Sequence, residues 1–327
     1  MRINGQVKRT KDQHYVPQMH LRHFRGDSPK NMIWTYSKSR GTVRPSRVEE
    51  TGFKKNFYSV RAGNGDYVDD LDTLLGGIES KAAPVYERLL AGEIPDGQDR
   101  ADFAAFVATC YSRSPALIRA YAESIARMEV LELRVRAQNP ASFNQLMNEL
   151  ERETGCAVED RAAVMKFIND PSRYSIGVSE KLGLRAIAIA DELTPILFER
   201  TWNVVTALDG YFITCDNPVY RWVPANTAHA IYGDGGFMNG RAEITLPLSA
   251  TKMLLIGGHT SEGGDHAIGW RTLEQLNRMR AANAEEFLFA NCKDDRIATL
   301  AHEFSNSRPR MRIGMKAAND FEVKVRR

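Results

Sequence analysis

The chain has 327 residues, of which 43% are hydrophobic and 26% are charged. This balance excludes an intrinsically disordered chain, and the length allows about two domains, so we expect two closely packed halves around a sizeable core. The net charge of +3, from 44 basic and 41 acidic residues, is too even to require a polyanionic partner.

Basic residues gather at both ends of the chain. If the fold brings these ends together, they would form a patch able to contact phosphates. The alternative is two solvated basic tails. The residues concerned are Arg2, Lys8, Arg9, Lys11, Arg22 and Arg25 at the start, and Arg308, Arg310, Arg312, Lys316, Lys324, Arg326 and Arg327 at the end.

The cysteines and the apolar runs indicate a cellular compartment. The four cysteines are far apart in sequence and form no Cys-x-x-Cys pair, which is typical of reduced thiols. Residues 1–13 are not followed by the apolar core of a signal peptide, and no apolar run approaches the roughly 20 residues needed to cross a bilayer. We therefore expect a cytoplasmic protein that does not bind membranes.

The first predicted elements are a short helix and a few strands. Pro17 suits a first helical turn, so we expect a helix over 17–24 with Leu21 and Phe24 facing the core. His20 and His23 would share the neighbouring face. A hairpin is predicted over 32–36 and 42–48, and a further strand over 57–60.

Long helices follow. The apolar spacing predicts one from 66 to about 91 with Pro84 inside it, and a second from about 100 to 137 that Pro115 interrupts. Arg113 lies at this break, where a side chain can leave the regular surface. Two amphipathic helices are expected between 142 and 170, and one more over 179–198.

Strands return after Trp202. Residues 202–208 and 211–215 flank Asp209-Gly210, the strongest hairpin signal in the chain. The remaining predictions are strands at 243–246 and 252–257, a mobile glycine-rich loop at 257–269, a helix at 273–286, a strand at 287–290 and a helix at 295–304.

This order predicts an α+β fold, with a helix-rich body and an antiparallel β region formed by the N-terminal and C-terminal parts of the chain. We divide the sequence into a motif helix with short strands (1–65), a helical region (66–200), an antiparallel β region with late helices (201–305) and a basic tail (306–327).

Several short motifs resemble one family. They are His14-Tyr15-x-Pro17-x-x-x-Leu21-x-x-Phe24, Thr214-x-Asp216-Asn217-Pro218-Val219, Leu246-Pro247-Leu248-Ser249 and an asparagine in a late helix. Together they are similar to the uncharacterised bacterial family DUF4238, from about residue 12 to about residue 292. The family commonly has serine at the position of Cys215 and Arg-Thr-Pro at the position of Arg113-Ser114-Pro115. Of the three opening histidines only His14 matches, and the resemblance implies no activity.

The candidate site residues are polar groups that stand outside the apolar periodicity. His14 paired with Asp216 would give an oriented imidazole for general acid/base work, and Arg113 and Arg22 could hold a phosphate. Tyr15 and Asn217 are further candidates for substrate binding. The alternative is structural: Asp216-Asn217-Pro218 forms an Asx turn, and a hydrogen bond from His14 fixes the first helix.

Metal and cysteine chemistry are weaker alternatives. His14, His20 and His23 are of a metal-binding type, but no zinc motif covers them, so core-edge histidines are favoured. Cys215 beside Asp216 lacks a nucleophile signature and is better explained as a small core residue. No metal ligand is assigned, although a divalent ion as cofactor stays open.

We therefore expect a phosphodiester-directed hydrolase, namely a nuclease of bacterial defence or toxin type. In this hypothesis His14, Asp216 and Arg113 are catalytic, and the partner is nucleic acid. The alternative hypothesis is a non-catalytic binding or adaptor protein whose motif residues are structural. The sequence indicates no oligomeric state.

Overall fold

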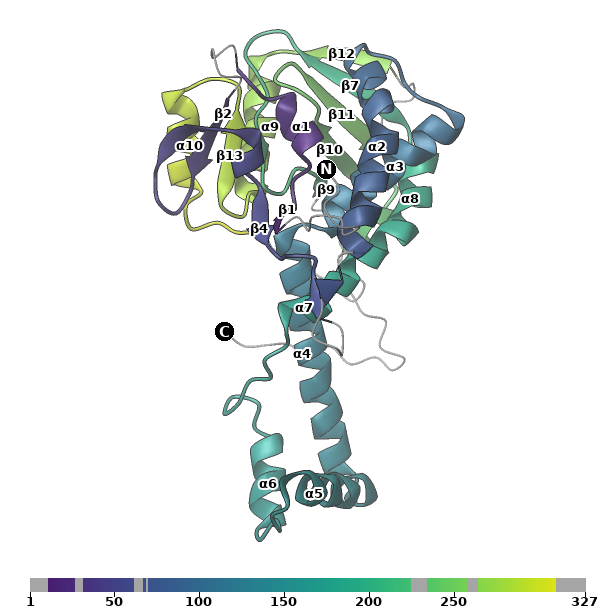
Figure 1. Cartoon of the computed structure of the whole chain (residues 1–327), viewed down its shortest axis with the longest axis vertical. Coiled ribbons are helices and arrows are strands. Elements are labelled where there is room, and N and C mark those ends of the chain that lie inside the picture. Colours follow the sequence, from purple (N-terminus) through teal and green to yellow (C-terminus); the bar gives the residue numbers. More distant parts are fainter. Residues whose placement is uncertain are drawn as a thin grey trace, which may run out of the picture.

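The computed structural model of this chain describes residues 11–26, 32–61, 67–68, 70–224, 234–257 and 264–309. Most of the basic residues at the two ends lie outside this range. The predicted phosphate-binding patch between the ends therefore stays a prediction. The described strands form a five-stranded sheet, a four-stranded sheet and two short two-stranded sheets. We call the first two the larger and the smaller sheet. Figure 1 shows a body of sheets and helices, from which a long helical arm projects.

The larger sheet has five strands in the order β12-β7-β11-β10-β9. Its strands are β12 (Gly264–Ile268), β7 (Trp202–Ala207), β11 (Lys252–Gly257), β10 (Glu243–Pro247) and β9 (Tyr220–Trp222). Alternate residues point to opposite faces, as strand geometry requires. On β7, Trp202 and Val204 join the main core, whereas Val205 packs with Leu273 on the other side.

The smaller sheet joins both ends of the chain. Its order is β3-β2-β13-β8, and all its pairs are antiparallel. The strands are β3 (Val43–Ser46), β2 (Ile33–Ser37), β13 (Phe287–Ala290) and β8 (Thr214–Cys215). This confirms the α+β class, the 32–48 hairpin, the strand at 287–290 and the β region shared between the two ends of the chain.

The predicted hairpin around Asp209-Gly210 is wrong. Gly210 does turn the chain, with a φ of 98°, but β7 and β8 belong to different sheets. The reason is that β7 already pairs with β11 on one side and β12 on the other. Residues after the turn find no free edge on β7, and β8 pairs with β13 instead.

Two further β predictions need correction. The glycine-rich segment 257–269 is not wholly a loop, because its second half forms β12, and β12 pairs with β7 in parallel. The β region is therefore mixed rather than entirely antiparallel. Within 57–60 only Val60 is in a strand: β5 (Val60–Arg61) pairs with β6 (Tyr67–Val68). The preceding strand, β4 (Phe53–Lys55), pairs with β1 (Asp12–His14).

Helices cover both faces of the larger sheet. α2 (Asp70–Leu90), α3 (Gly97–Ser112) and α8 (Ile189–Glu199) pack on one face, and α9 (Trp270–Asn283) packs on the other. α9 and α10 (Asp295–Glu303) also cover one face of the smaller sheet. α1 (Gln18–Arg22) lies on its opposite face, where Leu21 and Phe24 are buried as predicted.

The arm comes from the middle of the chain. α4 (Pro115–Gln138) leaves the body, and α5 (Pro140–Thr154) and α6 (Arg161–Ile168) fold back at its far end (Figure 1). These elements confirm the predicted break at Pro115 and the two helices between 142 and 170. The predicted helix over 179–198 is instead split into α7 (Glu180–Gly183), a 3₁₀ segment η2 (Leu184–Ala188) and α8. Within the described ranges, no helix is long and apolar enough to span a membrane.

Candidate functional site

A pocket of about 480 Å³ opens where the first strand and helix meet α2 and the end of α3. It contains one histidine, two arginines and three carboxylates within a single depression. The lining residues are Asp12, His14, Gln18, Met19, Arg22, Asp72, Leu75, Gly76, Glu79, Ser80, Ala83 and Arg113. The structure thus brings together three of the six residues predicted for the site: His14, Arg22 and Arg113.

His14 is held at the end of β1. Its backbone pairs with Phe53 of β4, and its ring lies 5.6 Å from the Phe53 ring. The ring nitrogens face the amide of Gln18, at 3.3 Å and 3.4 Å. Partial burial lowers the pKa of His14 below 6.5, although a hydrogen bond to the backbone of Glu49 and the charge of Glu79 act in the opposite direction. The imidazole is therefore neutral at pH 7 and can accept a proton.

Arg113 is a buried cation at the wall of this pocket. It follows α3 directly, and Ser114 and Pro115 then start α4, so the side chain leaves the helix surface at the break. Only 1% of Arg113 is exposed. Its Nη1 donates to Oε1 of Glu79 at 2.8 Å, whereas its Nε has no partner among the described residues. Burial lowers the pKa of Arg113, but Glu79, together with Cys110 and Tyr58, acts in the opposite direction, and the pKa lies above the ordinary value.

Arg22 is the exposed cation of the site. It lies on α1, and its Nη2 donates to the side-chain oxygen of Gln18 at 3.1 Å. The same Gln18 amide contacts His14, so one residue positions both the histidine and the exposed arginine. An exposed arginine beside a buried one is suited to contact an anion that enters from solvent.

Asp216 does not line the pocket. Its carboxylate accepts three backbone N–H groups, from Glu285 and Glu286 at 2.7 Å and from Phe287 at 2.8 Å. Asp216 follows β8, and because β8 pairs with β13, its carboxylate meets the turn that leads into β13. Burial raises the pKa of Asp216 to about 7, although the three N–H donors favour the ionised form. The structure therefore does not form the predicted His14–Asp216 pair.

Asn217 and Tyr15 are also buried away from the pocket lining. The Nδ2 of Asn217 donates to the carbonyl of Asn283 at 3.2 Å, and the Nδ2 of Asn283 donates back to Asn217 at 3.0 Å. Tyr15 packs against Phe57 in the core. Burial raises the pKa of Tyr15 well above 10, and nearby Asp216 adds to this. In this structure Asn217 and Tyr15, both predicted to bind substrate, therefore make contacts that stabilise the fold.

The other two opening histidines lie apart from the pocket lining and have partners of their own. His20 is completely buried between the hydroxyls of Tyr86 and Thr214, and His23 stacks on Tyr86 with ring centroids 4.5 Å apart. In the described part of the chain, no group of three histidine, cysteine or acidic side chains could hold a metal. Burial raises the pKa of the Cys215 thiol to about 12, which fits a core residue and not a nucleophile.

Glu79 is the site residue that the sequence analysis missed. A signal for it does exist. The buried residues Leu75, Ala82, Tyr86 and Leu89 follow one stripe of α2, and Glu79 occupies the next position of that stripe, four residues after Leu75. A carboxylate within an apolar stripe indicates a buried partner, and that partner is Arg113.

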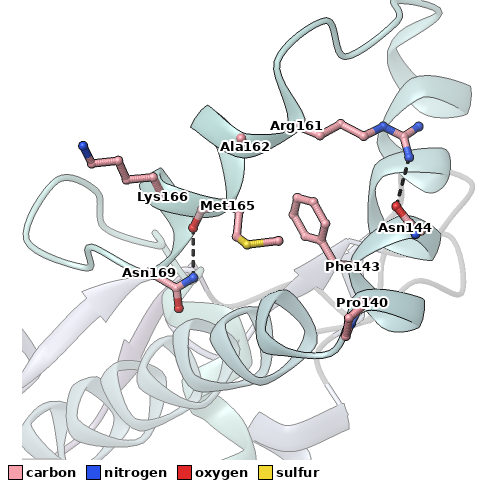
Figure 2. A pocket seen from close by; sticks show the side chains of 8 residues that line it. All are labelled: Pro140, Phe143, Asn144, Arg161, Ala162, Met165, Lys166 and Asn169. Atoms are coloured by element: carbon pink, nitrogen blue, oxygen red, sulfur yellow. Dashed lines mark hydrogen bonds between the residues drawn. The ribbon is translucent and has the colours of Figure 1, made fainter.

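A second pocket, of about 500 Å³, lies in the arm between α5 and α6 (Figure 2). Phe143 and Met165 point toward each other across it. Its cations are Arg161, which donates to Asn144 and Glu151, and Lys166. Its lining includes no histidine, no carboxylate and none of the residues predicted for the site.

Comparison with known proteins agrees with the motifs. No curated protein and no solved structure matches the chain significantly. The family model described as protein of unknown function, DUF4238, matches residues 12–294. This range contains the two sheets, the pocket around His14 and the arm. Because the model matches most of the sequence, the chain belongs to the DUF4238 family.

Proposed function

We propose that this protein is a phosphodiester-directed hydrolase, a nuclease that acts in the pocket around His14. The observation that carries the proposal is that His14, Arg22 and Arg113 line one pocket. A neutral histidine can serve as general base, and two arginines can bind a phosphate and stabilise charge in the transition state.

We assign a role to each of these residues from its contacts in the pocket. His14 takes a proton from a water molecule, the water oxygen forms a bond to phosphorus, and the bond from phosphorus to the leaving oxygen breaks. The leaving oxygen then takes a proton from solvent water, and His14 returns its proton to solvent. Arg113 faces the phosphate from the buried side and Arg22 from the solvent side. Glu79 replaces Asp216 in our assignment, because Glu79 is the carboxylate of the pocket that bonds to Arg113 and raises the pKa of His14.

We further propose that the protein acts in the cytoplasm, in a bacterial defence or toxin role. In support, all four cysteines are free, as expected in a reducing compartment. A divalent metal ion as cofactor stays open, so assays should include both added Mg²⁺ and a chelator.

A second candidate function is a non-catalytic binding or adaptor role. It is favoured by the motif residues Asp216, Asn217 and Tyr15, which are buried and make structural contacts. The matched family motifs would then specify the fold, and the pocket would bind an anionic ligand without cleaving it. The two candidates differ in whether His14 is needed for a chemical step.

The test is cleavage of single-stranded and duplex DNA and RNA by the wild type and by His14→Ala. We expect the variant to lose about 10²-fold or more in rate, the usual contribution of a general base, while its far-UV circular dichroism and melting temperature stay near the wild-type values.

His302→Ala is the matched control, since His302 is exposed on α10, outside the pocket. It should keep the wild-type rate. Equal rates for the wild type and His14→Ala would remove the general-base role. Absence of any cleavage, together with binding that depends on Arg22, would favour the adaptor role.

A further inference from the structure

Gln18 stands between the histidine and the exposed arginine of the pocket. Its side-chain oxygen accepts from Nη2 of Arg22 at 3.1 Å, and its amide nitrogen lies 3.3 Å from Nδ1 and 3.4 Å from Nε2 of His14. A guanidinium can only donate hydrogen bonds, so the atom of Gln18 that faces Arg22 is the oxygen. The amide N–H groups of Gln18 therefore point to His14.

This orientation of the amide requires a neutral imidazole. One ring N–H of His14 bonds to the backbone of Glu49, which leaves the other ring nitrogen to accept from Gln18. An imidazolium carries N–H on both nitrogens and can accept on neither. When His14 takes up a proton, its second N–H and the amide N–H groups of Gln18 become donors that face each other. That contact is unfavourable, because neither side offers an acceptor.

Rotation of the Gln18 amide removes this conflict. After the rotation the oxygen accepts from His14, and the NH₂ group faces Arg22. The bond to Gln18 is the hydrogen bond that the Arg22 guanidinium makes among the described residues, so the rotation leaves that guanidinium without its acceptor. Arg22 is exposed at the mouth of the pocket, and it is then free to bind an anion from solvent.

Building on the proposed function, we propose that Gln18 is a positioning residue that links the proton on His14 to the phosphate at Arg22: it holds Arg22 while His14 is neutral and releases Arg22 to the phosphate when His14 is protonated. Because linkage is reciprocal, the proton and the phosphate each favour the binding of the other. In the proposed hydrolysis His14 takes its proton from water, so the product phosphate is held at Arg22 until His14 returns that proton to solvent.

Other charged groups also surround His14 and contribute to its titration. Glu79 and Asp12 favour its protonated form, whereas Arg113 opposes it. The imidazolium itself also attracts an anion. The linkage is therefore measured as a difference between the wild type and a Gln18 variant, in which all these groups remain. The charged groups around His14 are Asp12 on β1, Lys55 opposite it on β4, Glu49 and its neighbour Glu50, Arg22 on α1, Asp72 and Glu79 on α2, and Arg113 after α3.

The test measures the Kd of dimethyl phosphate, a phosphodiester that keeps a single negative charge throughout the pH range used. The full-length wild type is compared with Gln18→Met, whose side chain has nearly the same length but lacks the amide. Gln145→Met is the matched control, because Gln145 is exposed in the arm, outside the pocket, and also bonds to a side chain four residues away. NMR titrations at equal ionic strength are run at about pH 8 and at about one unit below the pKa of His14, which NMR also provides.

At the higher pH we expect Gln18→Met to bind dimethyl phosphate about threefold more tightly than the wild type, because Arg22 no longer has to leave an acceptor. At the lower pH the two proteins should bind alike, since protonated His14 has already released Arg22. Gln145→Met should match the wild type at both pH values. Far-UV circular dichroism and melting temperatures should be the same for all three proteins.

Gln18→Glu is a second variant with a different readout. Its carboxylate can accept from Arg22 and from protonated His14 at the same time, so Arg22 is held at both pH values. We expect weaker binding of dimethyl phosphate than in the wild type at both pH values, and a His14 pKa raised by about one unit or more. An unchanged His14 pKa in Gln18→Glu overturns the contact on which the linkage rests.

The outcomes separate this linkage from the hydrolase proposal. If Gln18 only holds the fold, Gln18→Met binds more weakly than the wild type at both pH values. That result, or equal binding at both, overturns the linkage and leaves the hydrolase proposal standing. The expected binding pattern without any cleavage of nucleic acids overturns the hydrolase and leaves the linkage. A wild type that does not bind dimethyl phosphate at either pH overturns both the linkage and the phosphate-binding role of Arg22.

Discussion

Asp216 and Arg113 are both about 1% exposed, and the chain stabilises these two buried charges in different ways. Asp216 is held by three backbone N–H donors and Arg113 by one carboxylate. The carboxylate of Asp216 has its hydrogen bonds satisfied within the fold, whereas the Nε of Arg113 has no partner among the described residues. At the level of single residues, Asp216 therefore has a structural role, and Arg113 joins the end of α3 to α2 through Glu79 at the wall of the pocket.

Replacement of Asp216 should consequently affect stability more than chemistry. Asp216→Ala leaves three partly buried backbone N–H groups, at residues 285–287, without their acceptor. We expect it to lower the free energy of unfolding by about 3 kcal/mol or more, measured by urea denaturation. Asp209→Ala, at an exposed position in the same part of the chain, is the control and should change stability little. A stable Asp216→Ala protein with no cleavage activity would contradict the structural role.

At the scale of helices and strands, His20 links three elements, namely α1, α2 and β8. It lies on α1, its Nδ1 is 2.9 Å from the hydroxyl of Tyr86 on α2, and its Nε2 is 2.8 Å from that of Thr214 on β8. Tyr86 donates its own proton to the carbonyl of Leu248, so it accepts from His20. The imidazole is therefore protonated on Nδ1 and accepts from Thr214 on Nε2, and a second proton would break this arrangement.

This network predicts a pH dependence of stability. Burial lowers the pKa of His20 well below 6.5. The unfolded chain therefore binds the proton first, and the contribution of neutral His20 is complete above pH 6.5 and lost as the pH falls below it. Between about pH 7.5 and about pH 5.5, the wild type should lose roughly 1.4 kcal/mol more than His20→Gln.

Urea denaturation of both proteins at the two pH values measures this difference. Comparison with the variant is needed because other groups also titrate: burial lowers the pKa of His14 and His23 and raises that of Asp216. An equal loss of stability in the two proteins would show that His20 is not the responsible group.

At the scale of the whole molecule, the arm and the body have separate cores. The core of the arm consists of Ala137, Phe143, Met147 and Ile168, which share no cluster with the body. The middle of α4 carries mostly exposed or half-buried residues between these two cores. The arm can therefore open locally without unfolding the body.

Removal of the central aromatic ring of the arm tests this separation. Phe143→Ala should destabilise the arm by about 3 kcal/mol and speed amide hydrogen exchange in α5 and α6. Exchange in α3 and β11 should stay at the wild-type rate. Phe167→Ala, whose side chain is 40% exposed on α6, is the control with a smaller effect. Faster exchange throughout the body would show that the two cores unfold together.

The sequence by itself determined those features whose causes lie within a few residues. Pro115 and the Ser114 cap fixed the break between α3 and α4, apolar periodicity fixed the long helices, and Pro17 fixed the start of α1. The family motifs identified the correct family over nearly the matched range. The α+β class followed from the order of these elements.

Only the tertiary structure decided which distant segments meet. Residues 211–215 left β7 because both edges of that strand were occupied, and an edge is a property of the whole sheet. Glu79 proved to be the carboxylate that pairs with Arg113 in the pocket of His14, and the packing of α2 against α3 brings it there, while strand pairing carried Asp216 to the turn before β13. Local spacing cannot specify such partners, because burial and charge pairing depend on the chain as a folded whole.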